Sequence, residues 1–303
     1  MKKIALIGEC MIELNGSPFG EMRQTYGGDS LNTATYLARI ASPEKIGVYY
    51  ISALGNDALS LGMMAHWQAD NIDTRYVLRD AKRQPGLYLI QLDAQGERTF
   101  LYWRNQSAAR YLLQHPDWAL VEQSLADFDF IYLSGISLAI LPADDRERLI
   151  DLLAQHSGRI VFDGNYRPAL WQNRDETRAA YARLLPHVHL ALMTFDDEQA
   201  LWGDADAEAT IQRLQQAGVT EIVLKQGKAG ALYATADTRL AVQGENVAQV
   251  VDTTSAGDAF NAGFLNAYLQ GAEPQKCCHD GNRLAAIVIQ HKGAIIPKEY
   301  CRL

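Results

Sequence analysis

The chain has 303 residues, of which 48% are hydrophobic and 21% are charged, so it can bury the core of one large domain. Its formal net charge of −8 argues against nucleic acid and against an anionic membrane as main partners, because the overall field repels both. Four cysteines without a Cys-x-x-Cys pair, no signal peptide and no apolar run of the ~20 residues that a membrane span requires predict a cytoplasmic protein with reduced thiols.

The first predicted elements are a buried strand and a helix. Residues 4–7 form a continuous apolar run that ends at Gly8, which is typical of a parallel strand. Apolar residues recur at helical spacing over residues 31–40, directly after Gly27 and Gly28. Paired glycines before a helix more often form a turn than a ligand site, so by themselves they predict only a turn.

A β-hairpin is predicted over residues 87–104, with its turn at residues 94–96. Because side chains alternate along a strand, Tyr102 and Arg104 point to one face and Trp103 points to the other. An aromatic ring and a guanidinium on the same face can close over a small polar ligand. Alternatively, the aromatic residues of an exposed hairpin fill a dimer interface, and both interpretations can hold together.

Strands and helices alternate through the middle of the chain. The runs 128–135 and 159–163 predict strands and residues 146–155 predict a helix, which indicates parallel βαβ units with functional sites at the carboxyl ends of the strands. Arg167 lies just past the second of these strands, where it can bind a carboxylate or a phosphate through two hydrogen bonds. The alternative is a salt bridge between Arg167 and Asp163.

Two further segments follow in the same pattern. Residues 190–203 predict a strand, an acidic turn and a helix, and the acidic turn complements the helix dipole without any metal. Residues 221–233 predict two strands joined by a glycine-rich turn. The chain contains no Gly-x-x-x-x-Gly-Lys-Ser/Thr sequence, which excludes the P-loop kinases.

Residues 250–264 predict a strand, a tight loop and a helix. The small side chains of Ser255, Ala256 and Gly257 allow the first N–H groups of the helix to approach a ligand, and the helix dipole favours an anion there. Asp258 follows at once. Either it caps the helix, or it acts as a general base that accepts a hydroxyl proton beside a phosphate site.

The sequence of residues 252–260, Asp-Thr-Thr-Ser-Ala-Gly-Asp-Ala-Phe, resembles the signature of the ribokinase-like (PfkB) carbohydrate kinases, usually Asp-Thr-x-Gly-Ala-Gly-Asp-x-Phe. Ser255 occupies the position where the family normally has glycine, and a backbone with positive φ is less favourable for serine than for glycine. The Gly-Gly-x-x-x-Asn-x-Ala pattern at 27–34, the Asp-x-Asn-x-Arg pattern at 163–167 and the turn after Lys225 resemble other family motifs in the same order.

The resemblance implies a single ribokinase-like domain over residues 1–303. Its expected architecture is a three-layer α/β/α fold with a mostly parallel sheet and a small β-sheet lid, built from segments at about 12–26 and 86–105. Homo-oligomers of such proteins often form through the lid. The implied cofactors are ATP and Mg²⁺, with K⁺ as a further expectation.

The resemblance also implies roles for particular residues. Asp258 would be the catalytic base, and the N–H groups of Ser255, Ala256 and Gly257 would form the anion hole. Asp197, in place of the usual glutamate of an Asn-x-x-Glu motif that here begins with Thr194, would bind Mg²⁺ through water. Asp252 would bind a monovalent cation, although it could equally cap a loop. The residues implied to contact the sugar are Gly28, Asp29, Asn32, Tyr88, Tyr102, Arg104 and Arg167, together with Asp258. Those implied to contact ATP are Asn165, Arg167, Lys225, Gly227, Gly230, Ser255, Gly257 and Asn282.

Three stretches, at residues 8–14, 98–105 and 293–297, most resemble the 2-dehydro-3-deoxygluconokinases within this family. That resemblance implies ATP-dependent phosphorylation of 2-dehydro-3-deoxy-D-gluconate to its 6-phosphate. A sugar acid needs cations that a neutral sugar does not, and Arg104 and Arg167 could supply them in an otherwise acidic protein. The alternatives are a kinase for a neutral ketose or a nucleoside, and a sugar-binding member of the fold without catalysis.

Overall fold

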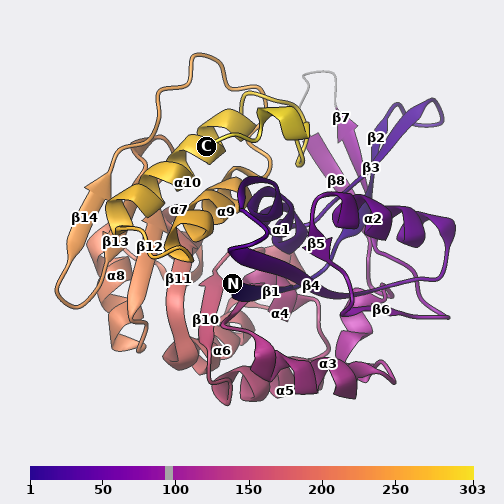
Figure 1. The fold of residues 1–303 in the computed structure, drawn as a ribbon, viewed down its shortest axis with the longest axis horizontal. Helices are drawn as coiled ribbons and strands as arrows, with labels where there is room; N and C mark the ends of the chain where they lie inside the picture. The colour runs from indigo at the N-terminus through magenta and orange to yellow at the C-terminus, as the bar shows by residue number, and fades with distance from the viewer. Residues whose placement is uncertain (93–97) are drawn as a thin grey trace.

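The centre of the fold is a mostly parallel sheet, seen in a computed structural model that describes residues 1–92 and 98–303 (Figure 1). Within these residues the sheet has ten strands. Their order is β14 (Arg239–Val242), β13 (Ala231–Ala234), β12 (Glu221–Lys225), β11 (Val188–Thr194), β10 (Arg159–Asp163), β9 (Phe130–Ser134), β1 (Lys2–Ile7), β4 (Ile46–Leu54) and β5 (Ile72–Asp73), with β6 (Val77–Arg79) also paired to β4. All pairs are parallel except β12–β13 and β13–β14. The predicted α/β class is confirmed.

Helices cover both faces of this sheet, because its strands are apolar on both sides. Ile4 and Leu6 of β1 lie in one core, whereas Ala5 and Ile7 lie in the other. The first core is covered by α1 (Asp29–Ile40), α2 (Ala58–Ala69), α9 (Ala256–Tyr268) and α10 (Pro274–Val288). The second is covered by α3 (Trp118–Ser124), α4 (Gly135–Ala139), α5 (Ala143–Ala154), α6 (Arg174–Leu184), α7 (Phe195–Trp202) and α8 (Ala207–Gln216). The expected three layers are therefore present.

A second, four-stranded sheet projects from one end of the body (Figure 1). In order, its strands are β3 (Met22–Gly27), β2 (Met11–Gly16), β7 (Leu87–Leu92) and β8 (Arg98–Trp103). We call this sheet the lid. The predicted hairpin corresponds to β7 and β8, which are antiparallel with Tyr88 opposite Tyr102, while its turn at residues 94–96 lies outside the described residues.

The strand predicted at Val250 and Val251 is wrong. The structure places no strand over residues 250–254, and both valines are about half exposed. The N–H groups of Val251 and Asp252 instead donate to the carbonyl of Ile289, just past the end of α10. Strand propensity depends on a neighbouring strand to pair with, and the chain offers this segment a helix end.

The structure also shows the state of the cysteines and the character of the helices. All four cysteines are buried and free of disulfides, and burial raises the pKa of the Cys277 and Cys278 thiols to about 12. No helix in the described part of the chain combines the length and apolar character needed to cross a bilayer.

Candidate active site

A buried polar network lies where the central strands end. Asp163 is the last residue of β10 and Lys225 is the last residue of β12, so the parallel register brings both to the same edge of the sheet. The ammonium of Lys225 lies 3.3 Å from Oδ1 of Asp163 and donates to Oδ1 of Asn261 at 2.9 Å. Asn261 Nδ2 donates to the other oxygen of Asp163 at 2.9 Å. A buried cation is thereby fixed beside α9, since a β-carbon on Gly257 would lie 3.7 Å from it.

The start of α9 forms a bend in which Ser255 is the N-cap residue. Its φ of 66° lies in the left-handed region that glycine adopts most easily. The N–H of Ala256 donates to the carbonyl of Thr253 at 3.2 Å, so one of the three expected anion-hole donors is already engaged. Among the described residues no hydrogen bond uses the N–H of Gly257. This N–H, the helix dipole and the Lys225 charge favour an anion at this point.

Asp258 lies in the first turn of α9 and is buried. Its Oδ2 accepts hydrogen bonds from Asn32 Nδ2 and from Ser255 Oγ, both at 2.9 Å. Within the described residues its carboxylate accepts no backbone N–H, so the helix-cap interpretation is wrong. Burial, reinforced by the nearby Asp29 carboxylate, raises the pKa of Asp258 to about 7. A carboxylate that titrates near neutrality suits a general base.

The first turn of α1 contacts the loop after β10. Asn165 Nδ2 donates to Oδ2 of Asp29 at 2.7 Å, and Asn165 has a positive φ of 35°. Burial raises the pKa of Asp29. The preceding Gly28 packs so closely that a β-carbon there would lie 2.1 Å from the carbonyl oxygen of Glu9. Residues expected at the sugar and at ATP are thus in direct contact with each other.

The lid places polar side chains over this region. The hydroxyl of Tyr88 donates to the carboxylate of Glu13, and Thr25 Oγ1 donates to the same carboxylate at 3.0 Å. A β-carbon on Gly27 would lie 2.9 Å from the Tyr88 hydroxyl and 3.8 Å from Oδ1 of Asn32. The lid tyrosine therefore lies next to the amide that holds Asp258. Tyr102 packs against Tyr88 with ring centroids 6.0 Å apart and remains half exposed.

Both predicted arginines already have a carboxylate partner. Arg104 forms a buried ion pair with Glu9, and its Nε donates to Oε2 at 2.9 Å. Arg167 is half exposed and lies 3.4 Å from Asp197, not from Asp163, so that alternative is wrong. Burial raises the pKa of Asp197, although the Arg167 charge opposes this shift. The two arginines therefore bind different carboxylates, Arg104 that of Glu9 and Arg167 that of Asp197.

Three of the residues predicted to contact ATP form a turn or hold a neighbouring loop. Gly227 and Gly230 lie between β12 and β13 with φ of 56° and 97°. A β-carbon on Gly230 would collide with the carbonyl of Val242, at 2.1 Å. Asn282 on α10 donates from Nδ2 to the carbonyls of Val242 and Gln243, at 3.3 and 3.0 Å. The Asn282 amide therefore holds the end of β14 in place.

Asp252 anchors the loop before α9. Its Oδ1 accepts the N–H of Thr254 at 3.0 Å, and its Oδ2 accepts the N–H of Gly293 at 2.8 Å. The loop-capping role that the sequence left open is therefore present. No group of three or more histidine, cysteine or acidic side chains in the described part of the chain is arranged to hold a metal ion.

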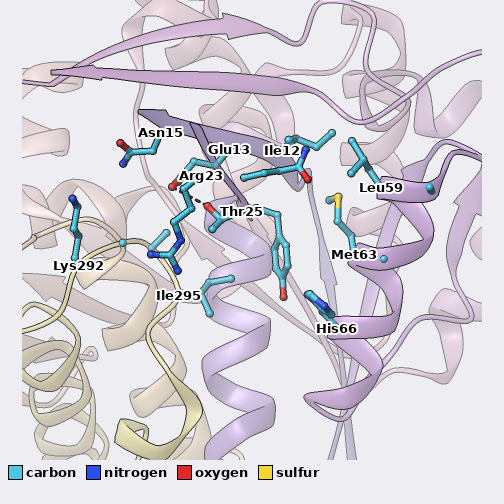
Figure 2. Close-up of a pocket in the computed structure, with 16 residues that line it drawn as sticks. Ile12, Glu13, Asn15, Arg23, Thr25, Leu59, Met63, His66, Lys292 and Ile295 are labelled. Atoms are coloured by element: carbon cyan, nitrogen blue, oxygen red, sulfur yellow. Dashed lines mark hydrogen bonds between the residues drawn. The ribbon is translucent and has the colours of Figure 1, made fainter. Parts of the chain in front are cut away.

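A cavity of about 480 Å³ opens beside the lid, between β2, β3, α2 and residues 292–295 (Figure 2). Figure 2 shows Arg23 extending from β3 toward Ile295, with Met63 and His66 of α2 on the other side. Glu13 contributes to its wall and also binds Tyr88. The cavity is of the size that small ligands occupy.

Comparison with known proteins decides the family. A family model described as "pfkB family carbohydrate kinase" matches residues 1–301. The chain belongs to this family. It is 60% identical to the 2-dehydro-3-deoxygluconokinase of Haemophilus influenzae, over 98% of this chain and 96% of that protein. It is 44% identical to the enzyme of the same name from Escherichia coli K12, over 98% of both chains.

Solved structures agree with the ribokinase-like fold of this PfkB-family chain. Aminoimidazole riboside kinase from Salmonella enterica, solved with aminoimidazole riboside and an ATP analogue, superimposes with a TM-score of 0.83 at 22% identity. The superposition covers 99% of this chain and 98% of that structure. A PfkB protein from Polaromonas sp. JS666 gives the same TM-score at 24% identity, over 99% and 98% of the two chains. At these identities the likeness establishes the fold.

Sequence reasoning missed three polar residues of this PfkB site. Asn261 bridges Lys225 and Asp163, and it is completely buried. Its signal is an amide in a helical run of mostly small and apolar residues that begins near Asp258. Glu9 and Glu13 follow the first strand, but Arg104 and Tyr88, which bind them from the lid, lie 95 and 75 positions away, and no local pattern reveals these pairs.

Proposed function

We propose that this PfkB-family chain transfers the γ-phosphoryl group of ATP to the 6-hydroxyl of 2-dehydro-3-deoxy-D-gluconate. The observation that carries the proposal is the 60% identity to a 2-dehydro-3-deoxygluconokinase over 98% of this chain. Identity of that extent spans both the lid and the helix that bears Asp258. An ATP-using enzyme with four buried, free cysteines also fits the cytoplasm.

The proposed reaction has Asp258 as general base. The carboxylate accepts the proton of the 6-hydroxyl while that oxygen forms a bond to the γ-phosphorus. The bond between the γ-phosphorus and the β–γ bridging oxygen breaks, its electron pair stays on ADP, and Asp258 later releases the proton to water. The Gly257 N–H, the α9 dipole and the Lys225 ammonium stabilise the charge on the transferred group.

The sugar-acid end is proposed to bind between the lid and the body. Arg104 uses Nε and Nη2 on Glu9, and a guanidinium has five N–H donors, so the remaining donors can meet a carboxylate. Arg167 is half exposed and supplies a second cation. The other proposed contacts to the sugar acid are Gly28, Asp29, Asn32, Tyr88 and Tyr102.

The ATP side is proposed to follow the turn between β12 and β13. Lys225, Gly227 and Gly230 would lie along the phosphates, and the other proposed contacts are Asn165, Arg167, Ser255, Gly257 and Asn282. The Asp197 carboxylate lies at the same edge of the sheet. It would bind Mg²⁺ through a water molecule, while the phosphates of ATP would supply most of the metal ligands. The metal supplies neutralisation of phosphate charge when bound. We also assign Asp252 and the backbone near Gly293 to a K⁺ site.

A substrate panel tests the proposal. Purified protein with ATP and Mg²⁺ is assayed for ADP formation with 2-dehydro-3-deoxy-D-gluconate, fructose, ribose and adenosine, and the product is located by ³¹P NMR. We expect the sugar acid to give the highest kcat/KM and a 6-phosphate, and the Asp258→Asn variant to give almost no turnover. A preference for fructose, ribose or adenosine would replace the substrate assignment, and no turnover with any of them would leave a binding protein.

A further inference from the structure

The hydroxyl of Ser255 forms a hydrogen bond with the carboxylate of Asp258, the proposed general base. Ser255 Oγ donates to Oδ2 of Asp258 at 2.9 Å, and Asn32 Nδ2 donates to the same oxygen at the same distance. No donor in the described part of the chain reaches Oδ1 of Asp258. Two side chains from different parts of the sequence therefore hold one oxygen of the carboxylate and leave the other oxygen available.

This contact comes with an unfavourable backbone. Ser255 has φ 66° and ψ 12°, a left-handed conformation that a residue with a β-carbon adopts reluctantly and glycine adopts freely. The motif that the chain resembles has glycine at this position, and a glycine cannot make the contact. A serine at this position has a strained backbone, but its side chain provides a hydrogen-bond donor three residues before Asp258.

We propose that the Ser255 side chain is a positioning residue: with Asn32 it fixes Oδ2 of Asp258 so that Oδ1 faces the reacting hydroxyl. This inference rests on the proposed function of Asp258 as the base. It concerns the hydroxyl of Ser255 and not the backbone N–H of the anion hole. A hydroxyl that donates to a carboxylate also stabilises its ionised form, so the contact keeps the base competent at lower pH.

Titratable groups face Asp258 from three neighbouring elements, and two of them, the carboxylates of Asp29 and Asp163, oppose its ionisation. Asp29 and Tyr36 face it from α1, Tyr132 faces it from β9 and Asp163 faces it from β10. Burial and the carboxylates raise its pKa, whereas the hydrogen bonds from Asn32 and Ser255 lower it. Lys225 of β12 adds a positive charge near Gly257. Loss of the serine hydroxyl should therefore raise the pKa of Asp258 further.

Two variants separate the hydroxyl from the backbone. Ser255→Ala removes the hydroxyl and keeps the β-carbon in the left-handed conformation, and Ser255→Gly removes both. The measurement is the dependence of kcat on pH with saturating ATP and sugar acid. In both variants the acidic limb of this profile should lie about one pH unit higher than in the wild type. That shift corresponds to an about tenfold lower kcat at pH 6 and a much smaller loss at pH 9. Profiles that coincide with that of the wild type, or a shift in Ser255→Ala alone, would overturn the proposal.

A measurement without substrate distinguishes this inference from the proposed function. Thermal unfolding of wild type and Ser255→Ala is followed from pH 5 to 9, and the pair is repeated in the Asp258→Asn background. The hydrogen bond favours the ionised carboxylate, so the loss of stability in Ser255→Ala should grow as the pH rises from 6 to 9. In the Asp258→Asn background the loss should not depend on pH. Equal pH dependence in both backgrounds would overturn the contact, whereas a wild type that phosphorylates no sugar acid would overturn only the function.

Discussion

Arg104 and Glu9 form a buried ion pair that joins the lid to the body. Arg104 directly follows β8 of the lid, and Glu9 lies just past β1 of the central sheet. Both side chains are at least nine-tenths buried, so neither charge is compensated by water. The same arginine thus has a structural partner and, in the proposed function, a substrate partner.

A double-mutant cycle on this pair separates its two roles. Arg104→Met leaves a buried carboxylate without its partner, and we expect a loss of about 3–5 kcal/mol in the free energy of unfolding. Adding Glu9→Gln removes that unpaired charge and should restore most of the stability. The KM for the sugar acid should stay at least about tenfold raised in both variants, because the cation is absent from both. Denaturant unfolding and steady-state kinetics measure the two effects, and a KM that recovers with stability would contradict a substrate role for Arg104.

Asp258→Asn should make the protein more stable at neutral and alkaline pH. The folded pKa of about 7 lies above the ordinary value near 4, so folding favours the protonated acid. At low pH the carboxyl is protonated in both the folded and the unfolded state, and its burial costs little. As the pH rises from about 4 through 7, the unfolded state gains the free energy of ionising this group, and the folded protein loses stability. The variant lacks this penalty, and its advantage should reach roughly 2–4 kcal/mol above pH 7 and vanish near pH 4. Unfolding midpoints measured across this range test the effect, and an advantage that is equal at pH 4 and pH 8 would refute it.

The pH dependence of turnover should report the same carboxylate. A base is active only when ionised, so kcat of the wild type should fall about tenfold for each pH unit below about 7. Above pH 8 Asp258 is almost fully ionised, so its titration should no longer change kcat. An acidic limb centred near pH 4 would mean that Asp258 is not desolvated when substrates are bound.

Lys225→Met should weaken the use of ATP. The ammonium is held by Asp163 and Asn261 beside α9, so its loss removes the fixed cation of the anion site. We expect kcat/KM for ATP to fall roughly 10²-fold while the KM for the sugar acid changes little. Lys276→Met, at a lysine that is exposed on α10, is the control and should behave like the wild type. Equal kinetics for the two variants would remove Lys225 from the site.

The sequence allowed the arrangement of strand ends to be predicted, but not the pairing of distant charges. Parallel strands bring their carboxyl ends together, so Asp163 and Lys225 could be placed at one edge from the order of elements alone. The partners of Arg104 and Arg167 depend on how the lid and α7 pack, which local patterns do not encode. The strand expected at Val250 fails for a related reason, since strand propensity is realised only where a neighbouring strand is available.

The exposed edge of the lid should mediate self-association. β8 is an edge strand, and its residues Leu101 and Trp103 lie on the face opposite Tyr102 with substantial exposure, 38% and 59%. We propose that a second copy of this chain covers them. Trp103→Glu should shift the protein from dimer to monomer in light scattering, while Leu120→Glu, at an exposed leucine on α3, should leave the dimer intact. A wild type that is monomeric at every concentration, or a dimer that survives Trp103→Glu, would exclude association through this edge.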